Sequence, residues 1–164
     1  MTDERQRIEQ AKWLFERTLG WIATADVKVG VAVAIDTAML GGIAAAFTAS
    51  DPHSRSAWCY VALISATGGL VVAVFCAAMA AIPRILGPVS SLIYFGRISE
   101  RSAADYIEAF ATLSEEAFLK DLTTQIHRNA QIATEKHVWV RMSILWSFLA
   151  GIPWLAAIAL LVRT

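Results

Sequence analysis

Apolar residues along this chain gather in three long blocks that are separated by polar segments. The blocks cover residues 29–47, 58–82 and 142–162. Each is long enough to cross about 30 Å of hydrocarbon as a helix that rises about 1.5 Å per residue. The second and third blocks contain no charged residue, and the first contains only Asp36. Because backbone groups in lipid must be satisfied within the chain, the blocks predict three transmembrane helices and an all-α integral membrane protein.

The polar segments show helical periodicity as well. Residues 1–28 predict an amphipathic helix that runs on into the first span, with an apolar face formed by Ile8, Ala11, Phe15, Leu19 and Ile22. Residues 83–141 predict a helical extension with a short helix at 103–112 and a long one that begins at Ser114 and leads into the third span. The apolar or small face of this long helix is formed by Phe118, Leu122, Ile126, Ala133 and Val140. Residues 91–98 are too few and too aromatic to assign to helix or strand.

Composition and charge exclude two classes of protein. Only 17% of the 164 residues are charged, against about 25% in an average soluble domain, and 57% are hydrophobic. The 14 basic residues are balanced by 14 acidic ones. A disordered chain needs low hydrophobicity, and a nucleic-acid-binding protein usually carries a basic excess, so neither class fits and no nucleic-acid partner is expected.

Basic residues predict the orientation in the membrane. Residues 1–28 hold five of them and residues 83–141 hold seven, whereas the loop 48–57 holds only Arg55 and the C-terminal tail only Arg163. Segments rich in Lys and Arg remain in the cytoplasm. We therefore expect a multi-pass membrane protein with residues 1–28 and 83–141 in the cytoplasm, 48–57 as the outer loop and the C-terminus outside.

The sequence motifs of common enzymes are missing. There is no Walker-type phosphate loop, dinucleotide fingerprint, His-Glu-x-x-His motif or nucleophile elbow. His127 and His137 are ten residues apart on the long helix and do not share a face, and Cys59 and Cys76 lie within the second span. We therefore expect no enzymatic activity, catalytic residue, metal site or cofactor.

Asp36 is the ionisable residue of greatest interest, because a carboxylate near the middle of a bilayer costs about 2.5–3.5 kcal/mol on insertion scales. It lies about 160° around the helix from Ala34 and Ala38, so it points to the third span, another protomer or water. In an oligomer it could line a pore. The alternative is a neutral carboxyl that is bonded to Ser143, Ser147 or a neighbouring backbone group.

Small residues predict where helices approach one another closely. They recur at four-residue spacing, the pattern that favours close contact between membrane helices. The stripe of the first span is Gly30, Ala34, Ala38, Gly42 and Ala46, and that of the second is Gly69, Ala73, Ala77 and Ala81.

A basic and aromatic cluster follows the second span. Arg84, Arg97 and Arg101 lie near Tyr94 and Phe95. Arginines bind phosphate and aromatic rings stack on bases, so Arg97, Arg101, Tyr94 and Phe95 are candidates for a nucleotide site. The other interpretation, which we favour, is a basic rim beside the membrane with interfacial aromatic residues.

Four stretches together resemble one protein family. They are Trp21-Ile22-Ala23-Thr24-Ala25-Asp26-Val27-Lys28, the later Asp36, Leu92-Ile93-Tyr94-Phe95-Gly96-Arg97-Ile98, and the stretch from Asp121-Leu122-Thr123-Thr124-Gln125-Ile126 to Glu135-Lys136. In this order, and over nearly the whole chain, they resemble the transmembrane effector (PycTM) of Pycsar, the pyrimidine cyclase system for antiphage resistance. The resemblance carries over Asp26, Lys28, Phe95, Gly96 and Lys136 as signature positions without a role for each.

The resemblance implies a function. A partner cyclase would make cyclic UMP or cyclic CMP on infection, and the effector would respond by impairing the inner membrane, which ends in abortive infection. The expected location is therefore the bacterial cell inner membrane, with the C-terminus in the periplasm. Other Pycsar effectors have a recognisable cyclic-nucleotide-binding domain and this chain has none, so nucleotide binding would use the cytoplasmic helices and the Tyr94-Phe95-Gly96 segment. We expect a homo-oligomer. The alternatives are a membrane-anchored signalling or docking subunit without pore activity and, less favoured because no inverted repeat is visible, a small transporter.

Overall fold

The computed structural model describes residues 2–85 and 87–163, and over this part of the chain every regular element is helical. The elements are α1 (Thr2–Ala49), the 3-10 turn η1 (Pro52–Ser54), α2 (Ala57–Ala81), α3 (Phe95–Ser99), α4 (Ala103–Ala111) and α5 (Glu115–Val162). Helices α1, α2 and α5 are each long and apolar enough to cross a membrane. The predicted all-α class with three spanning helices is confirmed.

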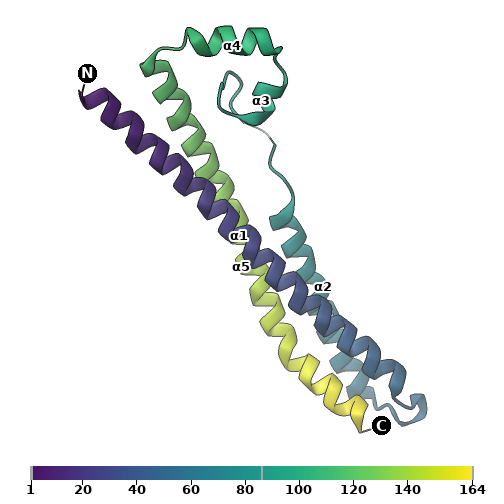
Figure 1. Cartoon of the computed structure of the whole chain (residues 1–164). Coiled ribbons are helices and arrows are strands. Elements are labelled where there is room, and N and C mark those ends of the chain that lie inside the picture. Colours follow the sequence, from purple (N-terminus) through teal and green to yellow (C-terminus); the bar gives the residue numbers. More distant parts are fainter. Residues whose placement is uncertain (1, 86, 164) are drawn as a thin grey trace. The chain divides into compact units, whose positions relative to one another are not determined.

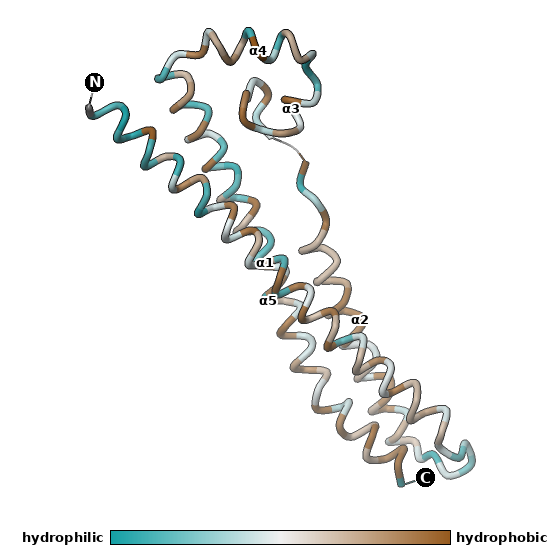
Figure 2. The backbone as a smooth tube through the Cα atoms, viewed as in Figure 1, coloured by the Kyte–Doolittle hydropathy of each residue, from teal (hydrophilic) through white to brown (hydrophobic). Residues whose placement is uncertain are grey.

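The chain divides into two compact units. We call Met1–Thr24 with Pro83–Glu135 the stalk unit, and Ala25–Ile82 with Lys136–Thr164 the membrane unit. Helices α1 and α5 pass without a break from one unit into the other. The colouring in Figure 2 shows mostly hydrophobic residues along α2, and hydrophilic ones gathered in the N-terminal half of α1.

Within the membrane unit, α1 and α5 run parallel and α2 runs antiparallel to both (Figure 1). Contacts between α1 and α5 advance together along the two helices, from Asp26 with Lys136 to Met39 with Trp154. Contacts between α2 and α5 run in the opposite sense, with Gly69 against Ala150 and Phe75 against Trp139. Three successive spans of one chain alternate in direction in this way.

Small and aliphatic side chains form the core of the membrane unit. One cluster brings together residues of all three helices near the loop between α1 and α2, among them Ile43, Leu70 and Ala157. A second cluster joins Ala25 and Val29 of α1 to Ala77 and Ala80 of α2 and Val140 of α5. Small residues let helix backbones approach closely, which compensates for the lack of a hydrophobic driving force between helices in lipid.

The buried positions of α1 recur at spacings of three, four and seven along the helix. They are Ile8, Ala11, Thr18, Ala25, Val29, Ala32, Asp36 and Ile43. This heptad spacing is typical of helices that pack side by side with interlocking side chains. Of the predicted apolar face, Ile8 and Ala11 are buried, whereas Leu19 is 44% exposed and Thr18, at 1% exposed, takes the buried position. We call this line of buried positions the seam of α1. A repeat of 3.5 residues places position 18 on the seam, whereas a straight helix of 3.6 residues per turn favours position 19.

Helix α5 starts where the sequence predicts, directly after Ser114. Ser114 caps the helix, because its hydroxyl accepts a hydrogen bond from the amide of Ala117 at 3.2 Å. Glu115 and Glu116 lie in the first turn, where carboxylates interact favourably with the helix dipole. The helix then continues past Arg141 to Val162 and includes Pro153. The short predicted helix at 103–112 is α4, for which Thr112 is the C-terminal cap.

Candidate functional site

An ion pair joins two of the family-signature positions across the membrane unit. Lys136 of α5 donates a hydrogen bond from Nζ to Oδ1 of Asp26 on α1. The lysine is 6% exposed, whereas the side chain of Asp26 is about half exposed. Long charged side chains are almost never this buried unless they are paired. Asp26 is therefore the group that allows Lys136 to occupy a seam position.

Asp36 lies further along the same seam and has a different environment. Its side chain is 0% exposed, and neither carboxylate oxygen makes a hydrogen bond of acceptable geometry within the described residues. The Ser147 hydroxyl is close enough to Asp36 to interact with it, but it donates its own hydrogen bond at 3.0 Å to the carbonyl of Ser143. The Ser143 hydroxyl is also buried without a hydrogen bond in this part of the chain.

This arrangement decides between the directions that the sequence left open for Asp36. The carboxyl group points to α5, on the side of Ser143 and Ser147, rather than to water. An unsatisfied polar group away from water costs about 1–3 kcal/mol or more. The Asp36 layer, which we define as Asp36, Ser143 and Ser147, is therefore the least favourable contact on the α1–α5 seam.

The two small-residue stripes behave differently. On α2, Gly69 packs so closely against α5 that an added Cβ would lie 2.9 Å from the Cβ of Ala150, and Ala73 is fully buried. On α1, Gly30, Ala34 and Ala38 are exposed, and Gly42 touches Trp154 only at the edge of its ring. Ala46, at the end of the α1 stripe, packs against the core cluster of the membrane unit. Only the end of the predicted α1 stripe therefore packs within a single chain, because the buried line of α1 runs along the opposite side of the helix at Gly30, Ala34 and Ala38.

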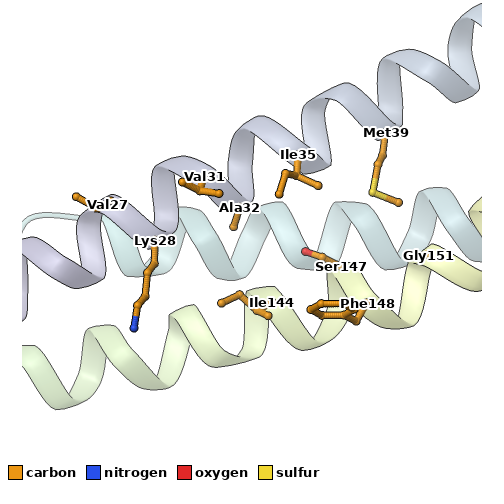
Figure 3. Close-up of a pocket in the computed structure, with 10 residues that line it drawn as sticks. All are labelled: Val27, Lys28, Val31, Ala32, Ile35, Met39, Ile144, Ser147, Phe148 and Gly151. Carbon is orange, nitrogen blue, oxygen red and sulfur yellow. The ribbon is translucent and has the colours of Figure 1, made fainter.

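A lateral groove runs along the α1–α5 seam beside the Asp36 layer (Figure 3). Its volume is about 550 Å³. The lining is apolar except for Lys28 at one end and Ser147 on the α5 side, and it comprises Val27, Lys28, Val31, Ala32, Ile35, Met39, Ile144, Ser147, Phe148 and Gly151. Ser147 thus borders both the groove and the carboxyl group of Asp36.

In the stalk unit, residues 91–94 are held against α5 by a set of polar contacts. The buried Ser91 hydroxyl accepts hydrogen bonds from the amides of Ile93 and Tyr94, at 3.2 and 3.0 Å, and from the Gln125 side chain at 3.0 Å. The carboxylate of Asp121 accepts the amide of Leu92 at 2.7 Å. These contacts explain why two distant stretches of the family pattern occur together, and the sequence had indicated no role for Ser91 or Gln125.

The four nucleotide-site candidates are not equally accessible. The Tyr94 hydroxyl donates to the carbonyl of Ile85, and an added Cβ on Gly87 or Gly96 would collide with the Tyr94 ring. Phe95 stacks obliquely on Tyr94, with ring centroids 4.8 Å apart, and is largely exposed. Arg97 forms an ion pair with Glu100 at 2.8 Å, and Arg101 is exposed. Tyr94 therefore organises this segment, while Phe95 and Arg101 face solvent.

No cluster of three metal-ligating side chains occurs among residues 2–85 and 87–163. Cys59 and Cys76 are buried free thiols on α2. His127 lies 3.1 Å from the amide of Gln131 on the surface of α5.

Comparison with known proteins gives one match. The family model described as "PycTM: Pycsar effector protein domain" covers residues 10–163. No curated protein and no solved structure matches the chain. Membership of Pycsar implies a cyclase partner that produces a cyclic nucleotide, and the proteins of this family are effectors rather than known enzymes. With a match over nearly the full length and three helices able to span a membrane, this chain belongs to the PycTM family and is a membrane-spanning effector of antiphage defence.

Proposed function

We propose that a cyclic pyrimidine nucleotide, cyclic UMP or cyclic CMP, triggers this effector to impair the inner membrane, and that the trigger acts by opening the α1–α5 seam at the Asp36 layer. The single observation that carries the proposal is the fully buried Asp36 carboxyl group without a satisfactory hydrogen bond. A seam with such a contact is easier to separate than one that is apolar throughout.

The energetic demand on the nucleotide is modest. Moving a two-state population from 1:99 to 99:1 takes about 5.5 kcal/mol of differential binding, and four equivalent sites in an oligomer would each supply about 1.4 kcal/mol. Once the seam separates, Asp36 gains access to water or to polar groups of other protomers. The exposed stripe of Gly30, Ala34 and Ala38 supports assembly, because small residues on a free face allow another helix to approach closely.

Dye release from liposomes that hold the purified protein tests the proposal. We expect release with cyclic UMP or cyclic CMP and none with cyclic AMP. Asp36→Asn keeps the shape and removes the charge, and Asp36→Val removes the polar group, so both should lower release, by about tenfold or more for the valine variant. Asp51→Asn, in the exposed loop before η1, is the matched control and should release dye as the wild type does.

Two results would contradict this mechanism. If the Asp36→Val variant released dye as the wild type does, Asp36 would have no part in the mechanism. Absence of release with all three nucleotides, in protein shown to be folded, would favour the docking-subunit function instead.

We further propose that the nucleotide binds at the segment formed by Tyr94, Phe95, Arg97 and Arg101. Phe95 offers an exposed ring for stacking on the base, Tyr94 holds that ring in place, and the two arginines offer charge for the phosphate. Calorimetric titration with cyclic UMP and cyclic CMP should show binding that Phe95→Ala and Arg101→Ala weaken at least about tenfold. Arg163→Ala is the control, and equal affinity in all variants would place the nucleotide elsewhere.

A further inference from the structure

The groove beside the Asp36 layer has one charged end and an apolar length. Lys28 is its only charged lining residue, and Figure 3 shows the Lys28 side chain extending from α1 towards α5. Among residues 2–85 and 87–163, no carboxylate forms an ion pair with Lys28, although Asp26 two positions earlier is paired with Lys136. The ammonium group is thus available to an external anion.

The dimensions of the groove match one leaflet of a bilayer. From Val27 to Met39 it follows α1 over twelve residue-to-residue steps, or about 18 Å at 1.5 Å per step. One leaflet contributes about half of a 30 Å hydrocarbon core. Lys28 lies where the charged part of α1 meets its apolar block. Lysine near the end of a membrane-spanning segment directs its ammonium group to the headgroup region of the bilayer.

We propose that this groove is a binding site for a phospholipid, with one acyl chain along Val31, Ile35, Ile144 and Phe148 and the headgroup phosphate paired with Lys28. The acyl chain would cover Ser147, which borders the Asp36 carboxyl group. A bound lipid would therefore shield the Asp36 layer from the surrounding bilayer. Both leaflets contain phosphate, and the proposal is therefore independent of the orientation of the protein and of its response to a nucleotide.

Native mass spectrometry of the full-length protein tests the site with defined lipids. The probes are phosphatidylglycerol, phosphatidylethanolamine and diacylglycerol with identical acyl chains. We expect both phospholipids to remain bound, the anionic one at least as well as the zwitterionic one, and diacylglycerol to bind at least about tenfold more weakly, because only the phosphate can pair with Lys28.

Variants separate the two halves of the site. Lys28→Ala should lower phospholipid binding to the level of diacylglycerol, and Lys28→Arg should retain it. Lys120→Ala removes an exposed lysine on α5 in the stalk unit and should have no effect. An added Cβ at Gly151 meets no atom within 4 Å, so a leucine at this position fits the backbone while its side chain fills the groove. Gly151→Leu should therefore weaken the binding of all three lipids.

Two outcomes would overturn the proposal. Equal binding of the three lipids, unaffected by Lys28→Ala and Gly151→Leu, would mean that only ordinary surrounding lipid contacts this face. Alternatively, a groove that holds no lipid and in which Phe148→Cys forms a disulfide-linked dimer would be an interface between two copies. The native Cys59 and Cys76 are buried, so such a dimer would be due to position 148.

Discussion

Lys136 and Asp36 are ionisable side chains that occupy seam positions of the same pair of helices, and they differ in what compensates their burial. Lys136 has the carboxylate of Asp26 as its partner. Asp36 interacts with the Ser147 hydroxyl, which already donates its hydrogen bond to a backbone carbonyl. Removing one member of a buried ion pair costs more than replacing both, because the remaining charge is left without compensation.

The Asp26–Lys136 pair should follow this rule in a double-mutant cycle. Asp26→Ala leaves Lys136 buried and unpaired, and we expect it to lower the free energy of unfolding by about 1–3 kcal/mol, less than for a fully buried pair because Asp26 is half exposed. Asp26→Ala combined with Lys136→Met should recover part of the loss. Chemical unfolding in mild detergent measures both values. The pairing would be contradicted if the double variant lost more free energy of unfolding than the two single variants lose together.

At the scale of elements, close approach between α2 and α5 depends on Gly69. A Cβ at this position would lie 2.9 Å from the Cβ of Ala150 and 3.4 Å from its Cα, and the backbone of α5 would have to shift. Its neighbour Gly68 lies on the same helix with no atom within 4 Å of such a Cβ. The two glycines therefore separate the effect of packing from that of helix propensity.

Gly69→Ala should lower the free energy of unfolding by about 1–3 kcal/mol, the usual cost of overpacking. Gly68→Ala should be neutral or slightly stabilising, because alanine is a better helix former than glycine. Thermal unfolding in mild detergent compares the two variants with the wild type. Equal midpoints for both would show that α2 and α5 are not in tight contact at this level.

The docking of residues 91–94 on α5 is a second property at this scale. Ser91→Ala removes the acceptor of three hydrogen bonds and leaves the buried Gln125 amide without this partner. We expect a cost of about 1–3 kcal/mol in local stability. Amide hydrogen exchange at Ile93 and Tyr94 should become faster, whereas the exposed Ser99→Ala should leave it unchanged. Unaltered exchange in Ser91→Ala would show that other contacts hold the segment.

For the whole molecule, the distribution of basic residues leads to a testable topology. Twelve of the 14 basic residues lie in residues 1–28 and 83–141, which predicts that these segments are cytoplasmic. In intact cells, His53→Cys should react with a membrane-impermeant maleimide, whereas Ser99→Cys should react only after permeabilisation. Both positions are exposed in the structure. The reverse labelling pattern would show that the protein has the opposite orientation in the membrane.

The sequence by itself determined the three spans, the N-terminal helix, α4 and the start of α5, whereas residues 91–98 allowed no assignment and α3 is known only from the structure. Apolar blocks, the Ser114 cap and the unbroken run into the third span are local signals, and helix formation depends on neighbours within about four residues. The placement of Asp36 on the side of α1 away from the small-residue stripe also followed from helical geometry, although its burial against α5 did not.

Only the tertiary structure decided which side chains meet. Asp26 and Lys136 are 110 residues apart, Ser91 and Gln125 are 34 apart, and no local pattern pairs them. Gly30, Ala34 and Ala38 of the α1 stripe are exposed in the single chain, since a small residue permits close packing but does not select a partner. The direction, register and partner of each long helix are set by the one alignment that buries the seams of the helices together. That alignment depends on contacts throughout the folded chain.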